Sequence, residues 1–253
     1  MKLFVAITGH ATLLPHFLSH YSQAGVSAFF IATEPELESQ IRRAASSFSA
    51  HIVSTLDCTE SIEGGTAAVS AMRRSFAGPE EWVVLADLDE FQVHPSGVVA
   101  TARAADLENA NVVRGRFIDR VASDGLLKPI GPHDDLWTLF PERCHVTALL
   151  QGGLDYKCAL VKGGLASGRT PEGLSLAHHH MVDERVASTS VEIHHFKWNA
   201  EALDRIPAAM ARTRSANQPF WVEYERVLEH LRQHGRLRWQ DFAALPDPTA
   251  GGS

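Results

Sequence analysis

The segment Glu81–Phe91 constrains the fold and the function of this chain more than any other. Its apolar run Trp82–Ala86 has the composition of a buried strand, and three acids follow at once: Asp87, Asp89 and Glu90. Carboxylates at the edge of a core are costly unless a cation, a basic side chain or water neutralises them. If the segment is extended, Asp87 and Asp89 point the same way and can share a divalent ion. The alternative is a solvated turn.

Strands and helices alternate before this segment. Apolar runs predict strands over 3–7, 29–31 and 51–53. Helical spacing predicts a first helix from Leu13 with Gly25 as its C-cap, a second over 35–47, and a third that follows Gly64-Gly65-Thr66 and ends near Phe76. This β-α order predicts an α/β fold with right-handed crossovers and a mostly parallel sheet. Ligands bind beyond the carboxyl ends of the strands in such sheets. We therefore expect one crevice to be lined by the polar residues that follow the strands, namely Thr8, Glu34, Asp57, Asp87 and Asp89.

The second part of the chain is less regular. The pattern predicts a helix over 98–107, strands over 111–121, 146–150, 158–161 and 190–196, and closing helices over 201–214 and 219–234. A loop over 167–176 contains Gly and Pro and is of the kind that often covers a site. No linker divides the chain, so we expect one domain over 1–245, followed by a disordered tail over 246–253.

Composition excludes several classes of protein. The formal net charge of −7 argues against a nucleic-acid partner, which requires a basic face. The three cysteines are widely spaced, so neither a disulfide framework nor a zinc knuckle is indicated, and a reducing cytoplasm fits best. No apolar stretch reaches the length of a membrane span.

Histidines form two clusters, His178–His180 and His194–His195. Neighbouring side chains on an extended segment point to opposite faces, so each cluster can offer a site one or two imidazoles. Such a histidine is either a hydrogen-bonded structural residue or a metal ligand, and the spacing leaves both readings open. Asp oxygens with one imidazole suit Mn²⁺ or Mg²⁺ better than a structural zinc.

These features together resemble GT-A glycosyltransferases related to families 2 and 92. The resemblance covers residues 1 to about 200 and is carried by Thr8–His10, Leu14–Tyr21, Trp82–Phe91, Gly115–Arg120, His179–His180 and His194–Trp198. Two positions depart from the family pattern: Gly9-His10 replaces the usual Asn-Glu, and Thr33-Glu34 replaces an Asp-Asn turn.

The resemblance implies a GT-A (nucleotide-diphospho-sugar transferase) fold, with a nucleotide-binding half over 1–91 and an acceptor-side half over 92–245. It implies metal-dependent transfer of a sugar from a nucleotide sugar, a UDP-sugar, to a hydroxyl of a glycan or small molecule. By the family's pattern Asp89 binds Mn²⁺ or Mg²⁺ directly, and Asp87 reaches the ribose or, through water, the metal. His180 or His195 completes the protein ligands. Thr8 and Asp57 match positions that hold the base and ribose.

An inverting transfer needs a carboxylate that deprotonates the acceptor hydroxyl. Asp134, Asp135 and Asp155 are the candidates, whereas a retaining enzyme needs no such base. Two rival functions remain at this point. One is a haloacid-dehalogenase-like, Mg²⁺-dependent phosphohydrolase, whose nucleophile motif is also an apolar strand followed by Asp-x-Asp. The other is a non-catalytic protein that binds a nucleotide or a sugar.

Overall fold

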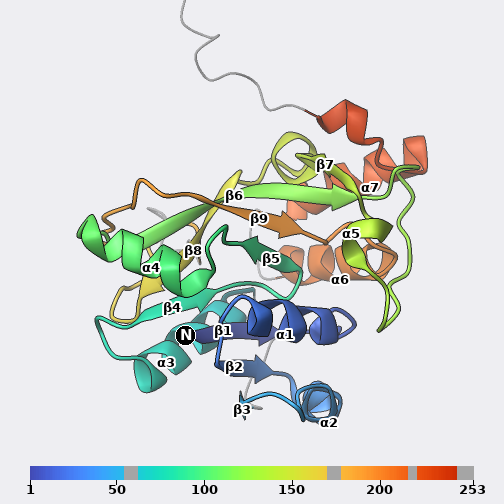
Figure 1. The fold of residues 1–253 in the computed structure, drawn as a ribbon. Coiled ribbons are helices and arrows are strands. Elements are labelled where there is room, and N and C mark those ends of the chain that lie inside the picture. The colour runs from blue at the N-terminus through green and yellow to red at the C-terminus, as the bar shows by residue number, and fades with distance from the viewer. Residues whose placement is uncertain (54–61, 170–177, 216–220, 244–253) are drawn as a thin grey trace, which may run out of the picture. The chain divides into compact units, whose positions relative to one another are not determined.

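The computed structural model describes residues 1–53, 62–169, 178–215 and 221–243 (Figure 1). The predicted binding residue Asp57, the predicted tail and most of the predicted covering loop lie outside these ranges. Within them, no helix has both the length and the apolar character that crossing a membrane requires.

The N-terminal part of the sheet is parallel, as the β-α order predicts. β1 (Lys2–Ile7) lies between β2 (Ala28–Thr33) and β4 (Trp82–Leu85), and β3 (Ala50–Val53) pairs with β2 (Figure 1). The helices between these strands are α1 (Leu14–Gln23), α2 (Pro35–Ala44) and α3 (Ile62–Phe76). This arrangement confirms the predicted α/β class with a mostly parallel, Rossmann-like sheet in this part of the chain.

Both faces of β1 are buried, which explains its nearly continuous apolar sequence. On one face, Phe4 joins Val83 and Leu85 of β4 in a cluster that packs against Val69 and Met72 of α3. Leu3 and its alternate neighbours point to the opposite face and are buried as well. The alternating side chains of β1 and the helical periodicity of α3 therefore contribute apolar residues to the same core.

The sheet continues beyond β4 in the order β3-β2-β1-β4-β8-β6-β9-β5. The added strands are β8 (Tyr156–Lys162), antiparallel to β4, β6 (Val112–Val121), antiparallel to β8, then β9 (Val191–His195) and β5 (Glu90–Val93). Helix α4 (Val98–Leu107) follows β5, and β7 (Glu142–Cys144) pairs with the end of β6. Gly115 of β6 faces Ile193 of β9 so closely that a Cβ would collide with that side chain.

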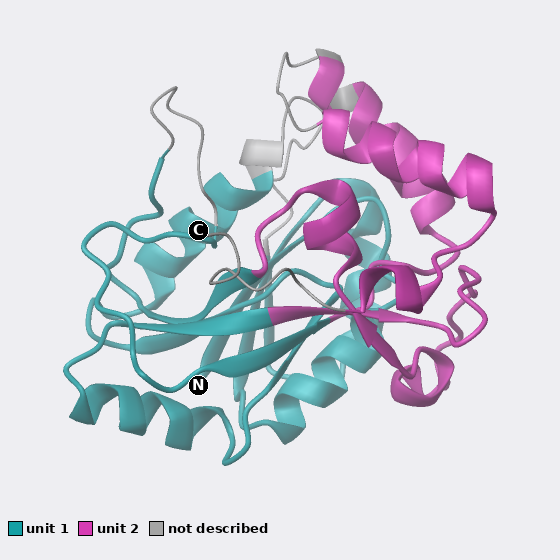
Figure 2. Ribbon diagram, turned by 90° about the horizontal axis from the view of Figure 1, so that it is seen from above, with its two compact units in different colours: residues 1–116, 156–194 teal, residues 117–155, 195–253 magenta. Residues whose placement is uncertain are grey.

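The chain forms two compact units, shown in teal and magenta in Figure 2. Unit 1 comprises residues 1–116 and 156–194, and unit 2 comprises residues 117–155 and 195–253. Unit 2 contains α5 (Leu136–Leu139), β7, a π-helical turn η1 (Thr147–Gln151), α6 (Ala202–Ser215), α7 (Trp221–His234) and a 3₁₀ turn η2 (Trp239–Phe242). Its core gathers around Trp198, with Ile206 and Val227 from the two long helices.

Two local predictions are wrong. Residues 146–150 do not form a strand, because Thr147–Gln151 is the π-helical turn η1. A short apolar run does not distinguish strand from helix by its period alone. Nor is the acidic segment extended: the Glu90 amide donates to the Asp87 carbonyl oxygen at 3.0 Å, which closes a tight turn. The prediction that Asp87 and Asp89 point the same way therefore loses its geometric basis.

Candidate functional site

The turn Asp87–Glu90, called the acid turn below, joins β4 to β5 in unit 1. Its two ends hold each other. The Glu90 amide donates to the Asp87 carbonyl oxygen, and the Asp87 amide donates to Glu90 Oε2 at 3.2 Å. The Glu90 side chain is 1% exposed, whereas that of Asp87 is 50% exposed. Glu90 is therefore the structural acid of the turn, and Asp87 is open to a ligand.

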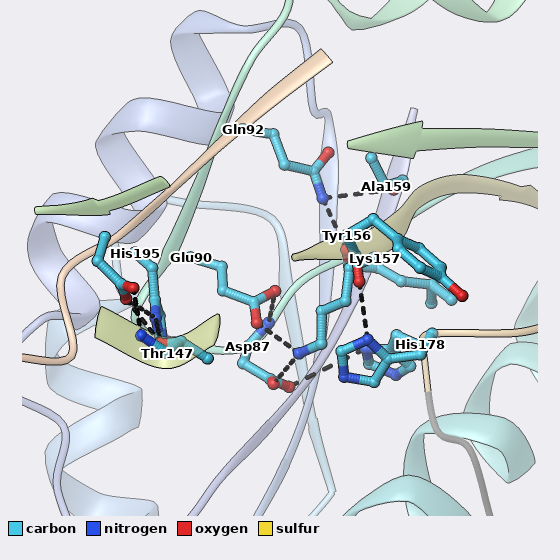
Figure 3. Close-up of polar contacts among 12 residues, drawn as sticks. Asp87, Glu90, Gln92, Thr147, Tyr156, Lys157, Ala159, His178 and His195 are labelled. Atoms are coloured by element: carbon cyan, nitrogen blue, oxygen red, sulfur yellow. Dashed lines mark hydrogen bonds and ion pairs between the residues drawn. The ribbon is translucent and has the colours of Figure 1, made fainter. Parts of the chain in front are cut away.

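Lys157 of β8 lies against this turn. Its Nζ forms ion pairs with Asp87 Oδ2 and with Glu90 Oε1, and Figure 3 shows the ammonium between the two carboxylates. Burial acts to lower the pKa of Lys157, but the attraction of both carboxylates outweighs it and raises that pKa well above its usual range. Burial likewise acts to raise the pKa of Asp87, and Lys157 with His178 holds it well below its usual range.

The three side chains of the first histidine cluster face different groups. His178 is buried, and its Nδ1 faces Asp87 Oδ1 at 4.0 Å (Figure 3). His179 Nδ1 lies 2.8 Å from the backbone oxygen of Tyr156. His180, the predicted ligand, is half exposed and lies 3.0 Å from Glu184. Burial lowers the pKa of both His178 and His179 to about 4, so both rings are neutral at pH 7.

Helix α1 and a buried polar network hold β5, the strand that follows the acid turn. The Tyr21 hydroxyl donates to the Glu90 carbonyl oxygen at 2.9 Å, and the Gln92 amide donates to that hydroxyl at 3.1 Å. The Gln92 side chain donates to the Leu85 carbonyl oxygen of β4 at 2.7 Å. His94 continues the network, with Nε2 at 3.1 Å from Gln92 Oε1. The backbone on both sides of the turn is therefore fixed.

The loops after β1 and β2 meet at the carboxyl edge of the parallel strands. The Gly9 amide donates to Glu34 Oε2 at 2.8 Å. Gly9 has φ +73°, in the left-handed region that favours glycine. Thr8 directly precedes it, so Thr8 and Glu34 lie on neighbouring loops, as predicted from the topology.

His195, from the second histidine cluster, belongs to a polar network within unit 2. Asp119 of β6 is buried and accepts hydrogen bonds from the Thr147 amide at 2.6 Å, Thr147 Oγ1 at 2.7 Å and Trp198 Nε1 at 2.8 Å. His195 Nδ1 lies 2.9 Å from the same carboxylate (Figure 3 shows His195 beside Thr147). A carboxylate on one ring nitrogen is the usual way in which a ligating histidine is oriented. His195, a predicted ligand, therefore has the support that such a role requires.

The two predicted catalytic acids also lie in unit 2, and both make local contacts. Asp134 Oδ2 accepts from the Gly131 amide at 2.7 Å. Asp135 caps α5, accepting from the Trp137 amide at 3.0 Å and from Thr138 Oγ1 at 2.8 Å. The Thr138 and Trp137 hydrogen bonds lower the pKa of Asp135, which makes it a weaker base.

Lys157 is the site residue that sequence reasoning missed. It stands at the start of a strand that was predicted from 158 onward, and its partners lie 70 and 67 residues earlier in the chain. The one available signal was the apolar strand itself, since a buried lysine there needs an acidic partner.

Neither a protein-family model nor a curated protein sequence matches the chain. Solved structures share parts of its fold. A nucleotidyl transferase from Methanothermobacter thermautotroptrophicus is 14% identical over 48% of this chain and 62% of that protein, with a TM-score of 0.31. A UDP-glucose pyrophosphorylase complexed with UDP-glucose is 13% identical over 50% and 60%, with a TM-score of 0.33.

A 4-diphosphocytidyl-2C-methyl-D-erythritol synthase from Anaerococcus prevotii is 11% identical over 76% of this chain and 86% of that protein, with a TM-score of 0.38. The chain thus spans less than two thirds of the length of the first two proteins. At these TM-scores the similarities carry no argument about function, which has to come from the residues of the site.

Proposed function

We propose that this chain is a metal-dependent glycosyltransferase of the GT-A type, which moves a sugar from a UDP-sugar to a hydroxyl of a glycan or small-molecule acceptor. The acid turn is the observation that carries the proposal. It follows a buried parallel strand and exposes Asp87, and a lysine and a tyrosine far away in sequence hold it in place. A solvated turn needs no such support, so the rigid placement favours a ligand site.

The donor atoms of the acid turn suit Mn²⁺ or Mg²⁺. Three carboxylates and one ammonium leave a net negative charge of two, and carboxylate oxygens are the ligands that hard divalent cations prefer. Asp89 would hold the cation directly, and Asp87 would contact the donor or reach the cation through water. When bound, the cation neutralises the charge that develops on the departing diphosphate. His180 and His195 stay predictions as further ligands.

The remaining residues hold the site in shape. Lys157 fixes Asp87 Oδ2, Glu90 fixes Lys157 and the Asp87 amide, and Glu34 fixes the loop that carries Thr8. Thr8 and Glu34 would line the nucleotide side of the site, together with Asp57. For an inverting transfer, Asp134 or Asp135 would take the acceptor proton. Asp135 is the less suitable of the two, since its carboxylate caps α5.

Calorimetric titration of UDP in the presence and absence of Mn²⁺ tests the proposal. We expect the wild-type protein to bind UDP with Mn²⁺ and to lose that binding in Asp89→Ala. Asp204→Ala, which removes an exposed acid in the first turn of α6, is the matched control and should bind as the wild type does. Equal affinity of wild type and Asp89→Ala, or no UDP binding by the wild type, would overturn it.

Turnover separates transfer from binding alone. A panel of UDP-sugars with Mn²⁺ should release UDP, slowly to water and faster with an acceptor. Asp87→Asn should abolish this release. Phosphate release from phosphomonoesters without any nucleotide would instead indicate a phosphohydrolase.

A further inference from the structure

His178 has a buried nitrogen that the structure leaves without a partner. Its side chain is 7% exposed, and Nδ1 makes no hydrogen bond with any residue in the described part of the chain. A buried polar atom without a partner costs free energy, so its presence needs an explanation. The atom faces Asp87 Oδ1 across 4.0 Å, as Figure 3 shows, which is too long for a hydrogen bond.

The gap between these atoms has the size of one oxygen. An oxygen about 2.8 Å from each of them can hydrogen-bond to both. Lys157 already occupies the other carboxylate oxygen of Asp87, so Oδ1 is the one that faces the gap. A cation held by both atoms would need the lone pair of Nδ1, and therefore the Nε2–H tautomer of the ring, whereas a hydroxyl oxygen can accept from Nδ1–H.

We propose that Asp87 Oδ1 and His178 Nδ1 together bind one sugar hydroxyl of the ligand. The hydroxyl donates to the carboxylate and accepts from Nδ1–H. A hydroxyl does both at one oxygen, as a water molecule does, whereas a carbonyl or an ether does not; a position that holds only water gives no preference for a hydroxylated probe over its deoxy analogue. His178 is thus a specificity-determining residue, and the protein rejects an analogue that lacks the hydroxyl, because the buried N–H is then left unpaired.

This inference rests on the proposed function for the identity of the ligand, since the hydroxyl belongs either to the ribose or to the transferred sugar. It also makes a claim about the protein alone. A ring that donates from Nδ1 is the Nδ1–H tautomer, the less common one in solution. The tautomer of His178 can be read in the metal-free protein by ¹⁵N NMR of the ring nitrogens.

The binding experiment compares three proteins with matched probes in the presence of Mn²⁺. The probes are UDP, 2′-deoxy-UDP and 3′-deoxy-UDP for the ribose, and UDP-glucose with its deoxyglucose analogues for the sugar. His178→Leu removes the donor and keeps an apolar side chain in the buried site. His178→Asn is the conservative control, since its amide N–H₂ can take the place of Nδ1–H. Circular dichroism and thermal unfolding establish that each variant is folded.

We expect the wild type to prefer one hydroxylated probe over its deoxy analogue by at least about tenfold, as the loss of one hydrogen bond to a buried group implies. His178→Leu should reduce that preference to near unity, and His178→Asn should retain most of it. If the hydroxyl belongs to the ribose, the preference appears between UDP and its deoxy analogues. If it belongs to the transferred sugar, the preference appears only between UDP-glucose and its deoxyglucose analogues. Unchanged preferences in His178→Leu, or an Nε2–H tautomer in the wild type, would overturn the inference. Absence of UDP binding in the wild type would instead sink the proposed function, and the tautomer would still test the inference.

Discussion

The Tyr21 hydroxyl of α1 donates to the carbonyl oxygen of Glu90, at 2.9 Å, and accepts from the amide of Gln92 at 3.1 Å. The Tyr21 side chain thus supplies hydrogen bonds to two backbone groups at the start of β5 that would otherwise need a neighbouring strand. The acid turn therefore has its position set from α1 as well as from β8.

Removing that hydroxyl should loosen the turn. In Tyr21→Phe two buried backbone groups lose a partner, so we expect the free energy of unfolding to fall by about 1–3 kcal/mol. Urea denaturation measures the change. Tyr156→Phe is the matched control: its hydroxyl makes no hydrogen bond with the described residues, and its ring still stacks under Arg114 at 4.6 Å. Equal losses in the two variants would contradict a special role for Tyr21.

The buried pair of Lys157 and Glu90 should show strong coupling. Lys157→Met leaves the buried Glu90 carboxylate without its counterion, and such a change destabilises a protein by about 3–5 kcal/mol. Adding Glu90→Gln removes the stranded charge, so the double variant should regain a large part of the loss. A double-mutant cycle from denaturation curves measures the coupling. Additive effects would show that the two charges do not interact.

Acid should destabilise the protein through His94. Burial lowers the pKa of His94 to about 4, and the charge of His20 adds to the effect. The unfolded chain therefore binds more protons than the folded one between about pH 6.5 and pH 4, so stability is full above pH 6.5 and falls as the pH falls through this window. The loss from one such shift is about 3 kcal/mol.

His94→Gln tests this dependence. The variant should show a flatter decline of unfolding free energy between pH 7 and pH 4.5, while the pKa of His20, which is also lowered by burial, still contributes a decline in the same direction. Identical pH profiles for variant and wild type would refute the assignment to His94.

Asp119→Asn should weaken unit 2. The amide would turn a donor toward groups that themselves donate, and each hydrogen bond lost from a charged acceptor costs about 1.5–3 kcal/mol. Because Trp198 donates to Asp119, tryptophan fluorescence can follow the unfolding of this region in urea. The midpoint of unfolding should lie at a lower urea concentration in Asp119→Asn than in the wild type. Asp134→Asn, a change at an exposed loop, is the control and should leave that midpoint within error.

Gly115→Ala should be destabilising by about 1–3 kcal/mol, since the added methyl group collides with Ile193 across the β6–β9 pair. Ile193→Ala in the same chain makes room and should restore part of the loss. If the second change only adds to the damage, the close approach of these strands is not the cause.

Most of the predicted strands and helices followed from local sequence patterns. β1 and β4 were predictable because both are continuous apolar runs that stop at polar residues, and the helix over 98–107 has clear periodicity. β5 was missed because it begins at Glu90, whose charge suggests solvent. The Glu90 side chain is buried together with its counterion Lys157, and a partner that distant in sequence does not show in a local pattern.

The site was predictable to a similar extent. Topology placed Thr8, Glu34 and Asp87 beyond the ends of parallel strands, and the contact between the Gly9 amide and Glu34 confirms that two of these loops meet. The choice within the histidine cluster was not predictable. Which of three consecutive rings is buried beside Asp87 depends on the path of the chain before β9, and the period of the segment offers no preference.

The antiparallel insertion of β8 between β4 and β6 also has a consequence for how the chain is made. During synthesis the acid turn leaves the ribosome with three carboxylates and no counterion from β8. Lys157, which supplies the ammonium, is not made until 67 residues after Glu90. Until then β4 presents an open edge, which is a template for pairing with other chains. Folding of the N-terminal sheet should therefore finish late, through a contact of high sequence separation, and a nascent chain that stalls before Lys162 should be prone to aggregate.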